Sequence, residues 1–155
     1  MEYKIYPAKT EEWEDAMALS WRVFNIYEAP EYSQEGVDSF LNFISDQNLY
    51  KMFSRGFYKL YLAKDSDGKL LGVIGVRNKN HISLLFVESK AHKQGIGSAL
   101  MDYALKEIRG YYHLEYATVN SSTYAEGFYH KLGFVDMGPK QESQGLIYTP
   151  MQIIF

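Results

Sequence analysis

The chain has 155 residues, a hydrophobic fraction of 46% and a formal net charge of −3, so we expect a single domain over residues 1–155 with one substantial core and no nucleic-acid partner. Because no cysteine is present, disulfides, thiolate zinc sites and a cysteinyl acyl-enzyme are excluded. The sequence shows neither a signal peptide nor an apolar run long enough to span a membrane, which predicts a cytoplasmic protein without membrane contact.

The N-terminal third is predicted to contain a short strand over residues 3–6, stopped by Pro7, and two helices. Thr10 can cap the first helix, which should end before Pro30, and Ser33 can cap the second. Apolar residues recur every three or four positions, as on the buried face of a helix: Trp13, Met17, Trp21 and Phe24 in the first, and Val37, Phe40, Leu41 and Ile44 in the second.

The middle of the chain is predicted to form an antiparallel meander. Strands near residues 57–63, 70–77 and 81–87 are separated by the turn-forming sequences Asp65–Gly68 and Asn78–Asn80. Short turns of this kind join neighbouring strands that run in opposite directions.

The second half is predicted to alternate helix and strand. A helix that follows a glycine-rich loop should end at Gly110; a strand over 116–119, a helix over 122–131 with Gly133 at its end, and a last strand over 146–154 come after it. The predicted order is βααβββαβαββ, an α/β fold with a mixed, mostly antiparallel central sheet and flanking helices.

The most informative segment joins the strand at 81–87 to the following helix. It consists of a buried strand, a short polar loop and a helix start that contains Gly95 and Gly97. Such a junction points free N–H groups at one spot, backed by the positive end of the helix dipole. Glycine has no Cβ, so an anion can approach the backbone closely. The segment therefore predicts a phosphate site.

Three phosphate-binding motifs can be compared with this loop. A P-loop ends in Gly-Lys-Ser/Thr, whereas this loop ends Gly-Ile-Gly-Ser. A dinucleotide fingerprint needs a third glycine, where Leu100 stands instead. The remaining pattern, Gln/Arg-x-x-Gly-x-Gly/Ala, grips the pyrophosphate of coenzyme A, and His92–Gly97 resembles it with His92 in the first position.

With two later segments, this motif resembles the GNAT family of N-acetyltransferases over nearly the whole chain. Asn120–Phe134 resembles the family's Asn…Ala…Phe-Tyr-x-x-x-Gly-Phe segment, and Gly145–Met151 resembles the final strand of small bacterial members. The resemblance implies the GNAT acyl-CoA N-acyltransferase fold, acetyl-CoA as co-substrate without a metal, and transfer of acetyl to a primary amine of a small molecule or protein. It also makes a homodimer a candidate assembly.

The resemblance further implies how the coenzyme is held. The main chain of Leu85, Phe86 and Val87 is expected to pair with the pantetheine amides and to polarise the acetyl carbonyl. Asn120 is a candidate contact of the pantetheine arm, with a strand end or helix cap as its alternative role. His92 departs from the usual Gln or Arg, but that position mostly supplies backbone. The expected coenzyme-binding residues are Leu85, Phe86, Val87, His92, Lys93, Gln94, Gly95, Ile96, Gly97, Ser98, Asn120 and Lys131.

Amine acetylation needs a group that removes a proton from the acceptor and a group that donates one to the departing thiolate. By resemblance, Tyr129 lies beside the coenzyme sulfur and is the candidate acid, since a phenol with a pKa of about 10 is protonated at neutral pH. His81 is the candidate base, because an unperturbed histidine pKa of about 6.5 suits that role. A water chain is the alternative to His81, and core packing is the alternative for Tyr129.

The acceptor site is expected between the first two helices and the late strands. Tyr27, Glu28, Glu31 and Tyr32 are candidates to line it, because an acid near an aromatic wall suits an ammonium group. A polar loop with packing aromatics is the alternative. A second hypothesis for the whole chain is a non-catalytic acyl-CoA-binding sensor or partner-docking module, which can keep the glycine loop without the acid and base.

Overall fold

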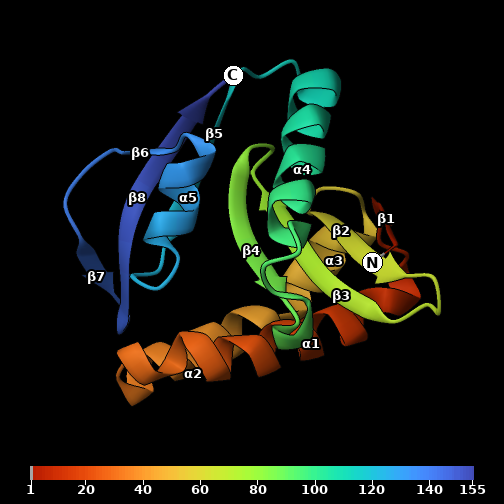
Figure 1. The fold of residues 1–155 in the computed structure, drawn as a ribbon. Helices are drawn as coiled ribbons and strands as arrows, with labels where there is room; N and C mark the ends of the chain where they lie inside the picture. The colour runs from red at the N-terminus through yellow and green to blue at the C-terminus, as the bar shows by residue number, and fades with distance from the viewer. Residues whose placement is uncertain (1) are drawn as a thin grey trace.

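The computed structural model describes residues 2–155, which form an eight-stranded sheet with strand order β1-β2-β3-β4-β5-β8-β6 and β7 paired to β8 (Figure 1). β4 and β5 run parallel, while the other paired strands described here run antiparallel. The mixed, mostly antiparallel α/β fold is thus confirmed. The strands are β1 (Tyr3–Pro7), β2 (Lys59–Asp65), β3 (Leu70–Arg77), β4 (His81–Val87), β5 (Tyr116–Ser121), β6 (Val135–Asp136), β7 (Gln141–Ser143) and β8 (Leu146–Ile154).

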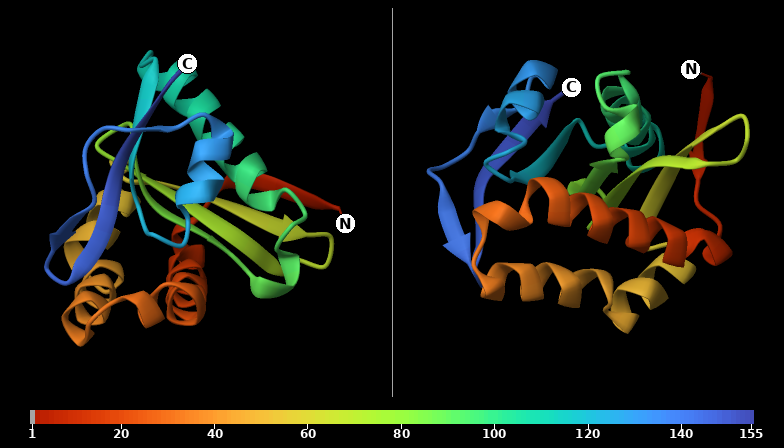
Figure 2. Two further views of the ribbon diagram at one scale, coloured as in Figure 1. Left: turned by 60° about the vertical axis from the view of Figure 1, so that its left-hand side comes forward. Right: turned by 60° about the horizontal axis from the view of Figure 1, so that its bottom comes forward.

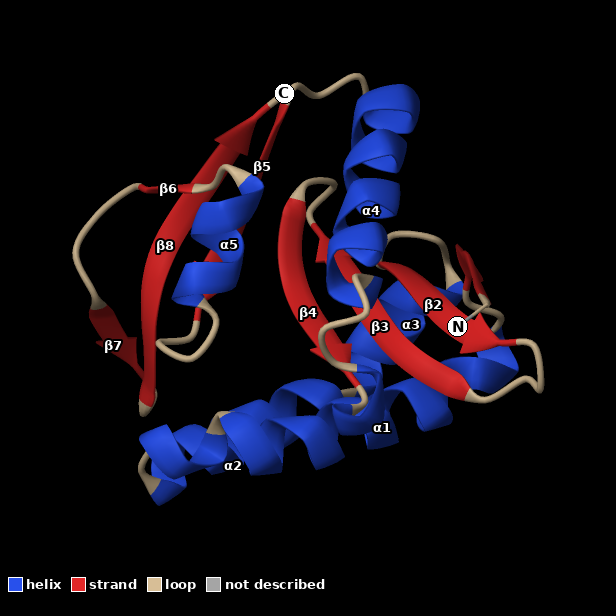
Figure 3. Ribbon diagram, in the orientation of Figure 1, coloured by secondary structure: helices blue, strands red, loops and turns tan. Residues whose placement is uncertain are grey.

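Helices cover both faces of the sheet (Figures 2 and 3). Strand side chains alternate between the faces, so Val73 packs with the first group of helices and Ile74 with the second. The resulting core has two layers with the sheet between them. The first group is α1 (Trp13–Tyr27), α2 (Gln34–Ile44) and α3 (Gln47–Ser54), and the second is α4 (Ile96–Tyr112) and α5 (Glu126–Leu132).

The structure corrects the predicted order by adding α3 and β7. The side chain of Asp46 caps α3 by accepting a hydrogen bond from the Asn48 amide at 2.9 Å. The helix buries Leu49 and Phe53 against α1 and β2, an amphipathic pattern too short to be recognised beside the longer second helix. β7 is an exposed three-residue strand that pairs with β8.

Several predicted helix details are also wrong. Leu41 is exposed on α2 rather than buried, although Phe40 and Ile44 are in the core. α4 continues past Gly110 to Tyr112 and ends at His113, which adopts the left-handed conformation at φ 58°. α5 starts at Glu126, later than predicted, because the Ser122 hydroxyl accepts from the Ala125 amide and holds a turn before it.

An extra residue on β4 bends the centre of the sheet. Val76 pairs with Ile82 and Gly75 with Leu84, so Ser83 forms a bulge. Its hydroxyl hydrogen-bonds the buried Tyr58 hydroxyl at 2.8 Å. Tyr58 packs so tightly over Gly75 that a Cβ there would lie 2.0 Å from the phenol oxygen. Gly75 is therefore required by its neighbour rather than by its own backbone.

β4 and β5 separate after a very short ladder. They pair only at His81 with Thr118 and at Ile82 with Val119, although β4 continues to Val87. The facing edge of β4 beyond Ile82 is left without a strand partner in the described chain. Apart from the Val87 carbonyl, which lies 2.7 Å from the Nε2 atom of His92, the backbone N–H and C=O groups on this edge can pair with another ligand.

We expect Gly75→Ala to lower the free energy of unfolding by about 1–3 kcal/mol, because the new methyl group overlaps Tyr58. Gly110→Ala is the matched control: its Cβ meets nothing within 4 Å on the exposed side of α4, so it should stabilise by about 0.5–1 kcal/mol. Urea denaturation of both variants measures the difference. Equal midpoints would contradict this account of the sheet.

Candidate functional site

Two cavities meet where β4 and β5 part. One, the loop cavity, has a volume of about 690 Å³ and is walled by the 92–98 loop, β4 and α5. The other, the inner cavity, has a volume of about 380 Å³ and is walled by β4, β5, α2 and the β7–β8 turn. The residues shared by both are Glu28, Leu85, Phe86, Ala125 and Tyr129.

The loop cavity has the features of a phosphate site. Gly95 turns the chain into α4 with a left-handed φ of 78°, so the amides of the first helical turn, including those of Ile96 and Gly97, open toward it. A Cβ on Gly97 would lie 3.3 Å from the ring of Phe128 on α5, which explains the second glycine by packing. Lys93 and Lys131 add positive charge at the rim.

The predicted coenzyme-binding residues lie together, apart from two. All except Gln94 and Asn120 line the loop cavity. The side-chain amide of Gln94 instead donates to the Lys90 carbonyl at 3.4 Å, and Asn120 lines the inner cavity. The site therefore collects residues from β4, the loop, α4 and α5, which fits a long, jointed ligand such as coenzyme A.

The His92 side chain has a role that the sequence did not indicate. Its Nε2 lies 2.7 Å from the carbonyl oxygen of Val87, so Nε2 carries the proton and donates. Its ring packs 4.9 Å from that of Tyr27, which packs 5.1 Å from Tyr124 on its other side. This aromatic stack joins the loop, α1 and the segment before α5 at the edge of the loop cavity.

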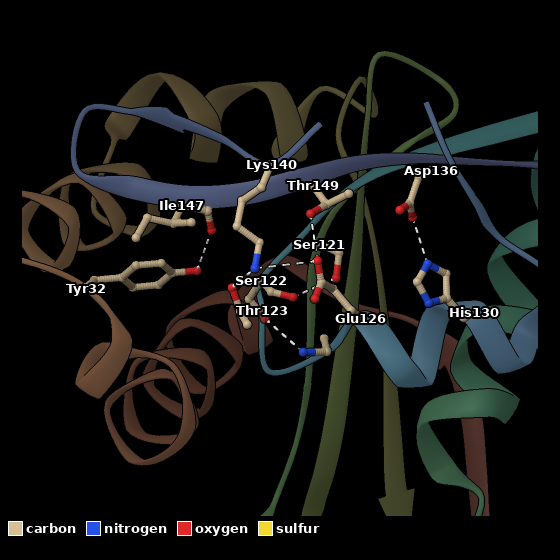
Figure 4. A network of polar contacts seen from close by, with 11 residues as sticks. Tyr32, Ser121, Ser122, Thr123, Glu126, His130, Asp136, Lys140, Ile147 and Thr149 are labelled. Carbon is tan, nitrogen blue, oxygen red and sulfur yellow. Dashed lines mark hydrogen bonds and ion pairs between the residues drawn. The ribbon is translucent and has the colours of Figure 1, made fainter. Parts of the chain in front are cut away.

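A polar network fixes α5, and with it Tyr129, against β8 (Figure 4). The Thr149 hydroxyl donates to the Glu126 carboxylate at 2.7 Å, and Lys140 donates to the Thr123 hydroxyl at 3.0 Å. The Tyr129 ring lies edge-on to Phe134 at 5.4 Å. Tyr129 is buried and lines both cavities.

Burial and, to a smaller extent, the nearby Glu31 carboxylate together raise the pKa of Glu28 to about 7. Burial also raises the pKa of Tyr129, with a smaller contribution from Glu28. At neutral pH, Glu28 can therefore accept a proton while the Tyr129 phenol remains protonated. The pair stands at the point that both cavities share.

The reason for predicting His81 as the base does not hold. Burial and, to a smaller extent, the positive charge of Arg77 together lower its pKa to about 4. Its Nδ1 lies 2.8 Å from the Thr118 hydroxyl, and its ring lines the inner cavity but not the loop cavity. An imidazole of such low basicity holds a proton poorly at neutral pH.

The four predicted acceptor residues do not form one site. Tyr27 lines the loop cavity, and Tyr32 lines the inner cavity, where its hydroxyl donates to the Ile147 carbonyl at 3.3 Å (Figure 4). Glu28 belongs to both cavities. Glu31 lines neither and acts on the site through the pKa of Glu28.

Other lining residues were missed. Arg77 at the end of β3 lines the inner cavity, although a charged residue at a strand end suggests exposure to solvent. Tyr124 lines the loop cavity, but nothing singles it out within the Asn120–Phe134 segment. The turn between β7 and β8 closes the inner cavity by a contact between distant segments. There the Ser39 hydroxyl donates to the Gln144 carbonyl at 2.6 Å, which no local pattern indicates.

Within residues 2–155, no group of three or more His, Asp or Glu side chains is placed to hold a metal ion. In the same stretch, no helix combines the length and the apolar character needed to cross a membrane.

The chain is similar to known acetyltransferases in sequence and in fold. The model of the acetyltransferase (GNAT) domain matches residues 28–155. The peptidyl-lysine N-acetyltransferase YiaC of Escherichia coli K12 is 34% identical over 82 residues, which are 52% of this chain and 54% of YiaC, so the match spans about half the length of that relative.

Two solved structures share the fold over the full length of this chain. A GCN5-related N-acetyltransferase of Rhodopseudomonas palustris superimposes with a TM-score of 0.83 at 21% identity, covering 97% of that protein. The PaiA N-acetyltransferase of Thermoplasma acidophilum, solved with coenzyme A, has a TM-score of 0.81 at 17% identity and is covered completely. The family match over most of the chain, the shared fold and the glycine loop that opens α4 lead to one conclusion: this protein belongs to the GNAT family of acetyltransferases.

Proposed function

We propose that this chain is an acetyl-CoA-dependent N-acetyltransferase that transfers acetyl directly to a primary amine. The observation that carries the proposal is the junction of the two cavities at Glu28, Leu85 and Tyr129. The loop cavity suits the phosphates and pantetheine of acetyl-CoA, and the inner cavity leads an acceptor amine to the same point. The acceptor is either a small molecule or an amino group of a protein.

Glu28 is proposed as the proton acceptor in place of His81. A simple alkyl ammonium has a pKa of about 10.4 and must lose a proton before its nitrogen can attack. A partly buried carboxylate with a pKa of about 7 attracts the ammonium and takes that proton more readily than an imidazole with a pKa of about 4. The nitrogen then attacks the thioester carbonyl carbon, and the C–S bond breaks.

The free edge of β4 and Tyr129 serve the other two needs of the reaction. Unpaired N–H groups between Leu85 and Val87 can polarise the thioester carbonyl. The Tyr129 phenol, kept protonated by burial, donates to the departing sulfur. Since the chain has no cysteine, direct attack is the simplest route. A homodimer and a cytoplasmic location remain predictions from the sequence.

The test of this proposal is release of free thiol from acetyl-CoA across a panel of primary amines, with acetyl-CoA binding measured separately by calorimetry. Binding together with amine-dependent thiol release supports the enzyme. Binding without release from any amine supports the acyl-CoA sensor instead, and lack of binding removes both.

Tyr129→Phe should lower kcat by roughly 100-fold or more, because it removes the proposed general acid while leaving the ring in place. The dissociation constant of acetyl-CoA should change little. Tyr103→Phe is the matched control, since Tyr103 lies on α4 against Tyr61 and lines neither cavity. An unchanged kcat in Tyr129→Phe would remove the phenol from the mechanism.

The pH profile of kcat/KM should rise with a midpoint near 7, as Glu28 becomes ionised. Glu28→Gln should abolish this ascending limb of the pH profile and most of the activity. Glu31→Gln should keep the activity and move the limb to lower pH, because it removes a charge that raises the pKa of Glu28. A limb that stays in place in both variants would rule out Glu28.

Glu28 should also make stability depend on pH. Because its folded pKa of about 7 lies above its unfolded value, its stabilising contribution is complete below about pH 4.5 and is lost as the pH rises through 7. Glu28→Gln should therefore melt a few degrees above the wild type at pH 8.5 and close to it at pH 5. Thermal denaturation at the two pH values measures this, and a Tm difference independent of pH would contradict it.

A further inference from the structure

The inner cavity contains a cationic side chain without a partner. Arg77 stands at the end of β3, opposite His81 on β4, and its side chain lines this cavity. Its Nε is buried and has no hydrogen-bond partner in residues 2–155, and no carboxylate in that stretch forms an ion pair with it. The guanidinium carbon lies 5.8 Å from the centre of the Phe43 ring on α2.

An arrangement of this kind is costly unless something else completes it. A buried donor without a partner loses its hydration and gains nothing in return. The charge also acts on its neighbours: it adds to the lowering that burial causes in the pKa of His81, and it partly offsets the rise that burial causes in the pKa of Tyr58. His81 stays neutral at neutral pH, so the residue opposite Arg77 adds no charge that balances it. A guanidinium offers paired N–H groups whose geometry matches a carboxylate.

We propose that Arg77 binds a carboxylate of the acceptor, so that the acceptor is a small amino acid carrying both a carboxylate and the amine to be acetylated. This inference rests on the proposed acetyltransferase function and narrows its substrate class. The amine is directed to Glu28 at the junction of the cavities, and the carboxylate to Arg77 at the far end of the inner cavity. Each charged group of the acceptor then lies beside a protein side chain of opposite charge.

The positions of Arg77 and Glu28 indicate how far apart the carboxylate and the amine of the acceptor should be. Arg77 faces His81, and Glu28 shares the junction with Leu85, four residues along β4. At about 3.3 Å per residue, the backbone positions are roughly 13 Å apart, and the two side chains shorten the gap that the acceptor must bridge. An amino acid whose amine is several carbons from its carboxylate fits better than one with both on the same carbon.

The experiment compares matched acceptors in the thiol-release assay: 6-aminohexanoate with pentylamine, and lysine with cadaverine. We expect kcat/KM to favour the carboxylate member of each pair by roughly 10- to 100-fold, mainly through KM. Arg77→Gln should remove the preference, and Arg77→Lys should keep part of it. Arg77→Glu should reverse it toward cadaverine, a change that a merely structural arginine would not produce.

Lys79→Gln is the charge-matched control, because Lys79 is exposed in the following turn and lines neither cavity. Melting curves show whether each variant is folded. Equal kcat/KM within the pairs, or a lysine-containing peptide preferred over every free amino acid, overturns the role of Arg77 and leaves the acetyltransferase proposal standing. Absence of thiol release from every acceptor overturns both.

Discussion

The structure depends on the early separation of two parallel strands. β4 and β5 share only the pairs at His81 and Ile82, after which β4 continues along a different path. That divergence creates both cavities, frees one edge of β4 and brings α1 and α5 to the same point from opposite sides. The bulge at Ser83 lies directly after the last pair, where a bend in β4 is needed. The position of the proposed reactive centre is therefore set by the topology of the sheet, and the side chains then determine its chemistry.

Desolvation then gives the side chains at this centre different roles. Loss of water disfavours the charged form of every group, so it raises the pKa of an acid and lowers that of a base. The pKa of Glu28 is raised to about 7, whereas His81 loses the basicity that its residue type suggested. Arg77 cannot respond in this way, because a guanidinium stays protonated in proteins. Burial in one environment thus makes Glu28 a suitable proton acceptor, makes His81 a weak base and leaves Arg77 with its positive charge.

The sequence indicated the fold well because its signals are local. Alternating strands, turn residues and the glycines that open α4 each act within a few positions, and the coenzyme loop followed from them. The interior of the site was harder. Whether His81 keeps its basicity depends on its burial and on Arg77, which strand pairing places opposite it. Gly110 is likewise a plausible helix end by sequence, yet α4 continues to Tyr112.

The contact between α2 and the β7–β8 turn has a further consequence. Gly36 and Gly145 approach so closely that a Cβ on the first would lie 2.3 Å from the carbonyl oxygen of the second. This wall of the inner cavity is thus joined by a close main-chain approach, to which the Ser39 hydroxyl adds its hydrogen bond to the Gln144 carbonyl. Substituting Phe43 or Ser143 can change which acceptors the inner cavity binds while the contact between Gly36 and Gly145 is kept. The lining of the inner cavity can therefore change without loss of this contact, provided that residues 36 and 145 stay glycine.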